Sequence, residues 1–292
     1  MPMHPAAPDD HNGMLDAFEQ TVQAIIDLGW ACREEEFDLP TEYGGLSVKK
    51  QLAHVVASEK ALAGIPRQLA ANDSEMLPYG AFARTIEADV ESRSRQTGKM
   101  VLQELAAFHP ERMEQLRRAE LELDSIIGGP FGPDTTFGQQ LLLRTIDAWT
   151  REQDLRQALN SPGDLDSAGA ALTTAEILRS LPRTVARTAQ IEAGHDVVFD
   201  VTGPVVAREG VRVRAGDDGR PFGVLLYSGT DRPEGQESTG VTSIRLTTEA
   251  LTRRAAGRRS VDEIHFSVIG DDEVAARVLE ALVLTQLLAT EQ

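Results

Sequence analysis

Two helical segments carry polar side chains at spacings that suit chemistry. In the segment 147–156, Asp147, Arg151 and Asp154 are spaced i, i+4 and i+7, so they share one helix face. A carboxylate and a guanidinium four residues apart can form an ion pair on that face. His54 lies on the other, mostly apolar segment, where an imidazole can serve as a base or as a metal ligand. A single histidine on such a helix is more often a core or interface residue, so the pattern leaves both interpretations open.

Other reactive residue types are isolated. The one cysteine, Cys32, excludes an internal disulfide and a cysteine-rich zinc site. It has no obvious base beside it, which favours a small buried residue over a nucleophile. The glycine-rich segment 128–132 follows a helical pattern rather than a strand, so we interpret it as an interhelical loop and not as a phosphate-binding loop. Four histidines are expected to be structural, exposed or in the N-terminal tail: His4, His11, His195 and His265.

Helical patterning dominates the first 160 residues. Apolar residues recur at helical spacing and predict helices at 15–28, 47–62, 82–127 and 136–159. Interruptions are expected near Gly98 and Pro110, and a loop is expected at 64–80 because of its glycines and prolines. Four principal helices are the minimum for a bundle.

The pattern changes after Pro162. A connector helix is predicted at 173–189, and alternating apolar residues then predict strands. The strands are expected at 195–202, 210–215, 222–228, 241–247 and 263–269, with helices near 247–256 and 271–288. Their order is too uneven for a doubly wound nucleotide-binding sheet. We therefore predict an α+β fold of two domains: a disordered tail at 1–12, a helical bundle at 13–165, and the connector helix with a smaller α+β domain at 166–292.

Composition excludes several classes of protein. The 292 residues include 29 Lys and Arg against 46 Asp and Glu, for a net charge of −17. Phosphate backbones and anionic membranes both favour basic surfaces, so we expect neither nucleic acid nor membrane partners. No apolar run approaches the roughly 20 residues that a bilayer crossing needs, and residues 1–14 lack the pattern of a signal peptide. We expect a soluble cytoplasmic protein.

The order of several short motifs resembles the mycothiol-dependent maleylpyruvate isomerase family. Each motif is weak alone, but together they extend over nearly the whole chain in a consistent order. They are LPT (39–41), GLSVK (45–49), LAHV (52–55) with Glu59, LAG (62–64), DAW (147–149), EQDLRQAL (152–159), PGDLD (162–166), VFDVTGP (198–204), RRAAGR (253–258) and IGD (269–271). The resemblance implies a DinB-like, up-and-down four-helix bundle followed by a small domain resembling sterol carrier proteins.

The resemblance also implies a metal site in the bundle. The family binds a divalent metal, usually zinc, through a histidine matching His54, an acidic residue matching Asp147, and a histidine four residues later. Three protein ligands leave one open position, which can activate water or a thiol. In the family that thiol is mycothiol, the small thiol of actinobacteria, and a metal-bound thiol is a strong nucleophile near neutral pH.

The sequence departs from the family at the third ligand. Arg151 stands there, and a guanidinium offers no lone pair to a metal. In one interpretation the site is metal-free: Arg151 replaces the charge of the metal, pairs with Asp147, and forms a hydrogen-bonded cluster with His54. In the alternative, zinc is held by His54, Asp147 and a recruited group, namely Asp154, Glu152 or His109. Asp154 also has a simpler role open to it, pairing with a nearby arginine or capping a loop.

Three functional hypotheses follow. The first is an isomerase or S-transferase that acts on a small molecule with mycothiol or a related thiol as cosubstrate. In it the pocket lies between the bundle helices and the second domain helps to close it. There His54 would be the base, Arg151 would orient an anionic group, and Asp154 would complete the polar floor with Asp147. The second is a non-catalytic small-molecule binding or regulatory protein on the same scaffold. The third is a metal- and thiol-independent enzyme of specialised metabolism. The sequence is compatible with a monomer or a homodimer.

Overall fold

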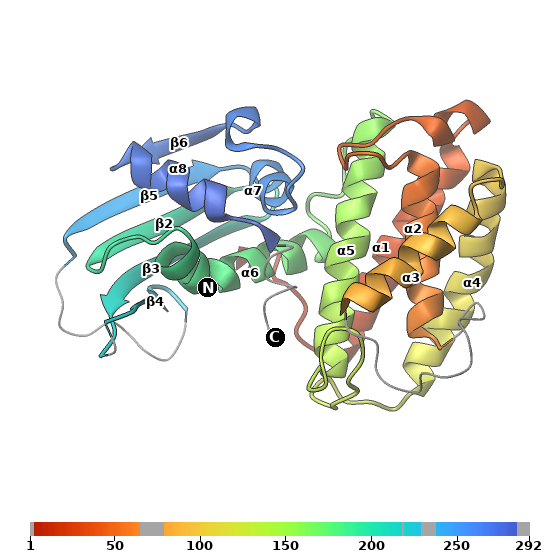
Figure 1. Cartoon of the computed structure of the whole chain (residues 1–292), viewed down its shortest axis with the longest axis horizontal. Helices are drawn as coiled ribbons and strands as arrows, with labels where there is room; N and C mark the ends of the chain where they lie inside the picture. Colours follow the sequence, from red (N-terminus) through yellow and green to blue (C-terminus); the bar gives the residue numbers. More distant parts are fainter. Residues whose placement is uncertain (1–2, 65–78, 218, 229–237, 285–292) are drawn as a thin grey trace. The chain divides into compact units, whose positions relative to one another are not determined.

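The computed structural model describes residues 3–64, 79–217, 219–228 and 238–284, and the chain divides into two units. Pro8–Gly163 form the helical unit, while the described residues before Pro8 and from Asp164 to residue 284 form the second unit (Figure 1). The division lies two residues before the boundary at 165 that the sequence pattern predicts. No helix in these described ranges is both long enough and apolar enough to cross a bilayer.

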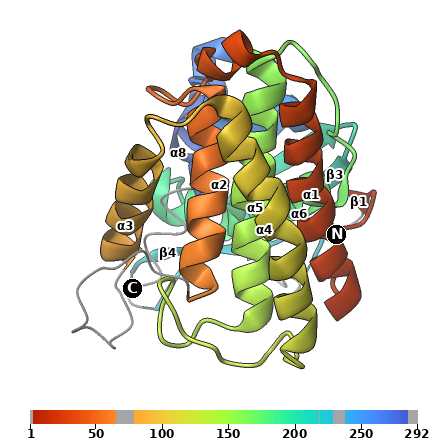
Figure 2. The same ribbon diagram turned by 90° about the vertical axis from the view of Figure 1, so that its right-hand side faces the viewer.

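The helical unit contains five α-helices within the described residues (Figure 2). They are α1 (His11–Ala31), α2 (Val48–Leu62), α3 (Tyr79–Ser92), α4 (Gly98–Arg118) and α5 (Phe137–Ala158), with a short 3-10 helix, η1 (Glu34–Asp38), after α1. Side chains that accept from the first turn fix four of the starts: Asp10, Ser47, Thr97 and Thr136.

The run at 82–127, predicted as one interrupted helical stretch, is divided more sharply than expected. It forms α3 and α4, which are separated at residues 93–97, and the second of them ends at Arg118. Thr97 caps α4 and therefore marks the break better than Gly98 does. Pro110 lies inside α4 without ending it, so the prediction of an interruption there was wrong. Most of the predicted loop at 64–80 lies outside the described residues.

The four long helices α1, α2, α4 and α5 do not simply alternate in direction, as a four-helix up-and-down bundle would. Helix α1 packs against α4 and α5, and α2 packs against the same two helices and α3. Lys49, near the start of α2, donates to the backbone of Ser94 and Gln96 just before α4, while Lys99 donates to the carbonyl of Gly29 near the end of α1. Helices α2 and α4 thus begin at the same end of the bundle and run parallel, because α3 returns the chain between them.

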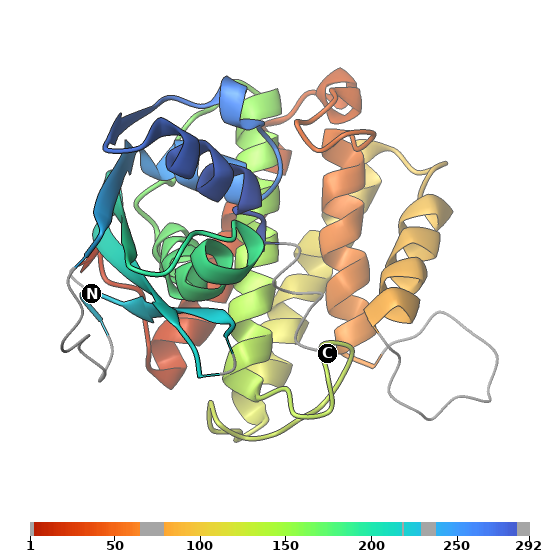
Figure 3. The same cartoon turned by 60° about the vertical axis from the view of Figure 1, so that its left-hand side comes forward.

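The second unit is a mixed sheet with helices packed on it (Figure 3). Its strands are β1 (Met3–His4), β2 (His195–Thr202), β3 (Val206–Ala215), β4 (Pro221–Leu225), β5 (Gly240–Leu246) and β6 (Phe266–Ile269). The order is β1-β3-β2-β5-β6, with β4 also paired to β3, and the β2–β5 pair is parallel. The helices are α6 (Ala168–Arg183), which continues as a π-helical turn η2 (Thr184–Thr188), α7 (Thr248–Ala255) and α8 (Asp272–Ala281); a 3-10 turn η3 (Val261–Glu263) precedes β6.

Two expectations for this unit need correction. Residues 3–12 are not a disordered tail, because Met3 and His4 pair with β3 and His11 begins α1. The connector helix begins at Ala168, five residues before the predicted start, where Ser167 caps it. The first predicted strand, β2, has the predicted bounds, and its alternating residues Val197, Phe199 and Val201 are buried in the core.

Candidate functional site

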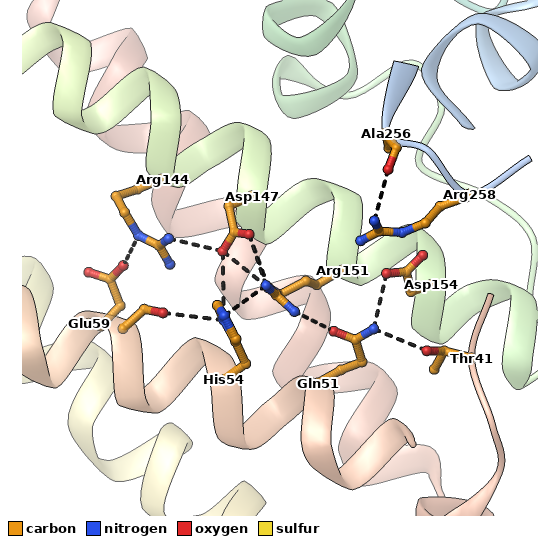
Figure 4. Close-up of polar contacts among 11 residues, drawn as sticks. Thr41, Gln51, His54, Glu59, Arg144, Asp147, Arg151, Asp154, Ala256 and Arg258 are labelled. Carbon is orange, nitrogen blue, oxygen red and sulfur yellow. Dashed lines mark hydrogen bonds and ion pairs between the residues drawn. The ribbon is translucent and has the colours of Figure 1, made fainter. Parts of the chain in front are cut away.

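Helices α2 and α5 pack together and place two matching rows of polar side chains face to face (Figure 4). From α2 come Gln51, His54 and Ser58, spaced i, i+3 and i+7. The row from α5 has the same spacing: Arg144, Asp147 and Arg151. The side chains meet between the two helices, so the structure brings His54, Asp147 and Arg151 into one cluster.

Arg151 is the centre of this cluster. Its Nε lies 3.2 and 3.1 Å from the two carboxylate oxygens of Asp147. Nη2 donates to His54 Nε2 at 2.9 Å, and Nη1 donates to Gln51 Oε1 at 2.6 Å. The arginine is buried, so these charge-assisted bonds are formed with little competing water. One guanidinium therefore binds His54 and Asp147 together.

The contact with Arg151 selects one neutral tautomer of His54. Arginine nitrogens only donate, so the 2.9 Å contact requires Nε2 of His54 to accept. The proton of the neutral ring then resides on Nδ1, which lies 3.2 Å from Ser58 Oγ and 4.0 Å from the nearer oxygen of Asp147. The lone pair that a base or a metal ligand would use is thus engaged by Arg151.

Asp147 is an anion held between cations. Burial alone would raise the pKa of its carboxyl, but the charges of Arg151 and Arg144 outweigh burial and hold that pKa well below its usual range. Arg144 donates from Nη1 to Asp147 at 2.9 Å. The paired cations consequently favour the ionised carboxylate, which is an acceptor of hydrogen bonds and not a proton donor near neutral pH.

The cluster extends into a row of alternating charges across α5, α2 and α4. Arg144 donates from Nε to Glu59 at 2.7 Å, and Arg112 donates to the other oxygen of Glu59 at 3.1 Å. The charge row is therefore Arg112, Glu59, Arg144, Asp147 and Arg151. Three cations and two carboxylates in direct contact give this row a net charge of +1.

Asp154 is connected to His54 through Gln51 and Arg151. Gln51 connects it to the cluster, since Gln51 Nε2 donates to Asp154 at 3.1 Å and to Thr41 Oγ1 at 3.1 Å, while its Oε1 accepts from Arg151. Asp154 is fully buried. It thus contributes to the position of Gln51, and through Gln51 to that of Arg151.

The donor set does not fit a zinc ion. Zinc needs three or four lone pairs from nitrogen, sulfur or oxygen. Arg151 donates to His54 Nε2 and to both oxygens of Asp147, so no lone pair converges on a common point. Of the recruited ligands in the alternative hypothesis, Glu152 binds Arg156 at 2.6 Å and His109 is buried on α4. No group of three His, Cys, Asp or Glu in the described part of the chain is placed to hold a metal.

Several residues of the cluster were not singled out by sequence reasoning as site residues: Gln51, Ser58, Arg112 and Arg144. The signal was present for two of them, since Gln51 and Arg144 lie on the same helix faces as His54 and Asp147. Cys32, by contrast, is buried as expected. Its thiol donates to the Leu28 carbonyl at 3.3 Å, and burial raises the pKa of this thiol, so it is a poor nucleophile.

The fold and this site define a two-unit α+β protein with a polar cluster inside a helical bundle. Residues 5–156, more than half of the chain, match the family model of the mycothiol maleylpyruvate isomerase N-terminal domain. The chain belongs to the mycothiol-dependent maleylpyruvate isomerase family, as its motifs predicted.

Solved structures show the same fold over both units. A crystal structure of the mycothiol-dependent maleylpyruvate isomerase is similar with a TM-score of 0.53 and 13% identity, over 88% of this chain and 92% of that chain. A histidine-to-alanine mutant of such an isomerase gives a TM-score of 0.52 and 12% identity, with the same coverage. No curated protein matches the sequence. At this identity the likeness establishes the α+β architecture, which confirms the predicted fold class.

Proposed function

We propose that the chain is a thiol-dependent enzyme of the isomerase or S-transferase type that acts on a small molecule without a bound metal ion. Mycothiol is the proposed cosubstrate, in keeping with the family. The observation that carries the proposal is the position of Arg151, whose guanidinium binds the residues that match the family's metal ligands. A fixed buried cation can stabilise a thiolate as a metal does, although it cannot form a coordinate bond.

Arg151 has the capacity for this role. Its Nη1 donates to Gln51 alone among the described residues, which leaves the second N–H of Nη1 for a ligand. Asp147 and Gln51 hold the guanidinium plane on two sides, so its bond to His54 is the contact that has to be released when an anion arrives.

An isomerase cycle can be written with these groups. The thiolate sulfur forms a bond to an electron-poor carbon of a conjugated double bond, and the displaced electron pair moves to the conjugated carbonyl as an enolate. Rotation about the new single bond follows. The enolate then re-forms the double bond and expels the thiolate unchanged. Arg151 would stabilise the negative charge throughout, and His54 would accept the thiol proton once Arg151 turns from Nε2 toward the sulfur. In an S-transferase the sulfur would remain bonded to the substrate.

A second candidate, a non-catalytic binding or regulatory protein, has one observation in its favour. His54 and Asp147 are already engaged by Arg151, so neither is available to react while that contact persists. A pocket that binds a thiol conjugate without reacting would need no such release.

The test is an activity screen with purified mycothiol. Conjugated cis-enones and other electrophiles would be incubated with the protein in the presence of a chelator, with and without thiol. Thiol-dependent turnover that survives chelation, and that falls by about 100-fold or more in His54→Gln, supports the proposal. A melting temperature raised by mycothiol without turnover favours the binding protein, and no response to any thiol contradicts thiol dependence.

A further inference from the structure

The histidine of the proposed cycle loses one of its contacts when it acts as a base. Arg151 donates to Nε2 of His54 at 2.9 Å, and this bond has to be released before Nε2 can accept a proton. From then on the hydrogen bond of the other ring nitrogen, Nδ1, sets the direction in which Nε2 points. The His54 side chain is 25% exposed, so packing surrounds the ring only in part. The group beside Nδ1 therefore matters for the proton transfer.

Ser58 lies where it can hold Nδ1. It follows His54 by four residues on α2, so the two side chains share a helix face, and its Oγ lies 3.2 Å from Nδ1. Because Nε2 accepts from Arg151, Nδ1 carries the proton and donates to the hydroxyl oxygen. Ser58 is only 1% exposed, and a short buried side chain has little freedom to leave this position.

Asp147 is the other acceptor near Nδ1, but it is less well placed. Its nearer oxygen lies 4.0 Å from Nδ1, which is beyond hydrogen-bond distance. The same oxygen accepts from Arg144 at 2.9 Å and from Arg151 at 3.1 Å, so two guanidinium groups already direct it. A serine hydroxyl thus stands beside Nδ1, where a carboxylate orients the histidine in a Ser-His-Asp triad.

We propose that Ser58 is a positioning residue, which keeps the His54 ring aligned for proton transfer after Arg151 has turned away. In that step the thiol proton moves from sulfur to Nε2 and leaves a thiolate and an imidazolium, whose Nδ1–H continues to donate to Ser58. When the thiolate is expelled at the end of the cycle, the proton returns from Nε2 to the sulfur. The inference rests on the proposed function for this transfer, but the contact at Nδ1 can be measured without turnover.

Ser58→Ala tests this role, and Thr21→Val is the matched control. Each change removes one buried hydroxyl from a bundle helix, but Thr21 donates to the Ala17 carbonyl within α1 rather than to a residue of the cluster. Proton–nitrogen NMR of the full chain near neutral pH measures how fast the Nδ1 proton of His54 exchanges with water. Steady-state kinetics with mycothiol, on an electrophile that the unmodified chain converts, separates kcat from KM.

We expect the Nδ1 proton of His54 to exchange at least about tenfold faster in Ser58→Ala, and less than about twofold faster in Thr21→Val, because only the first change removes its acceptor. Ser58→Ala should lower kcat about tenfold while KM changes less than about twofold, since the lost hydrogen bond is strongest when the ring is charged. Thr21→Val should leave both constants within about twofold of the unmodified chain.

The inference is overturned if the Nδ1 proton exchanges equally fast in Ser58→Ala and the unmodified chain, or if Thr21→Val produces the same changes as Ser58→Ala. Faster exchange in Ser58→Ala without thiol-dependent turnover of the unmodified chain would support the contact between Ser58 and His54 and contradict the proposed function. Turnover with the same kcat in Ser58→Ala would contradict this inference alone.

Discussion

Replacing Glu59 with glutamine should destabilise the helical unit strongly. Glu59 is 4% exposed on its side chain and accepts from Arg112 and Arg144, which are equally buried. In Glu59→Gln one amide oxygen still accepts from one arginine, but the amide NH₂ then faces the donor of the other. Removing one partner from a buried ion pair typically costs about 3–5 kcal/mol, and we expect a loss in that range.

Glu104 supplies the matched control. It also binds two cations, Arg93 and Lys60, but its side chain is 24% exposed. In Glu104→Gln water can solvate Lys60, whose side chain is 27% exposed, and Asp89 still pairs with the buried Arg93. We therefore expect that change to cost about 1–2 kcal/mol. The two variants make the same chemical change and differ mainly in burial.

Tryptophan fluorescence is the assay because both tryptophans lie in the helical unit. Trp149 is buried on α5 and Trp30 is half-exposed on α1, so urea unfolding followed by fluorescence reports on this unit alone. Equal losses of unfolding free energy in Glu59→Gln and Glu104→Gln would refute the reasoning, since burial of the charge row would then make no difference.

Three further predictions concern other parts of the helical unit. The pKa of Glu104 is lowered to about 2, because hydrogen bonds from its cationic partners outweigh the opposing effect of burial. The stabilisation that this carboxylate provides is present above about pH 4.5 and is lost as the pH falls toward 2; it amounts to at most about 3 kcal/mol before solvent screening. In Glu104→Gln the free energy of unfolding, measured with urea, should therefore fall less between about pH 4.5 and 2 than in the unmodified protein. A Cβ at Gly98 would overlap the buried Phe37 ring, so Gly98→Ala should lower the unfolding free energy by about 1–3 kcal/mol, while Gly80→Ala, with only a distant side-chain neighbour, should be neutral or stabilising; thermal unfolding compares them. Long-range proton–nitrogen NMR near neutral pH should show Nε2 of His54 unprotonated and Nδ1 protonated, and a protonated Nε2 would contradict the assigned bond to Arg151.

Features of the fold that depend on local sequence could be predicted. Ser47 and Thr136 cap helices close to the predicted starts, because an N-cap needs only its own side chain and the next turn. The alternation of β2 was equally clear. The contact between Asp147 and Arg151 follows from their i, i+4 spacing on one helix.

Features that depend on packing could not be predicted. The hydrogen bond from Arg144 to Glu59 joins residues 85 positions apart, and it forms because α2 and α5 pack together where these two side chains lie. Strand β1 has two residues, too few for any periodicity to show, and it exists because β3 offers an edge to pair with. The parallel course of α2 and α4 likewise depends on α3, whose separation from α4 is weakly marked in the sequence.

The metal content of the protein shows whether Arg151 takes the place of a metal ion. The chain and its Arg151→His variant would be purified without chelator, supplied with zinc, dialysed, and analysed by mass spectrometry of the metal. We expect the unmodified chain to retain far less than one zinc ion per molecule, because Arg151 occupies the lone pairs of His54 and Asp147. We expect Arg151→His to gain about one zinc ion per molecule. Stoichiometric zinc in the unmodified chain would contradict the claim that a guanidinium takes the place of the metal.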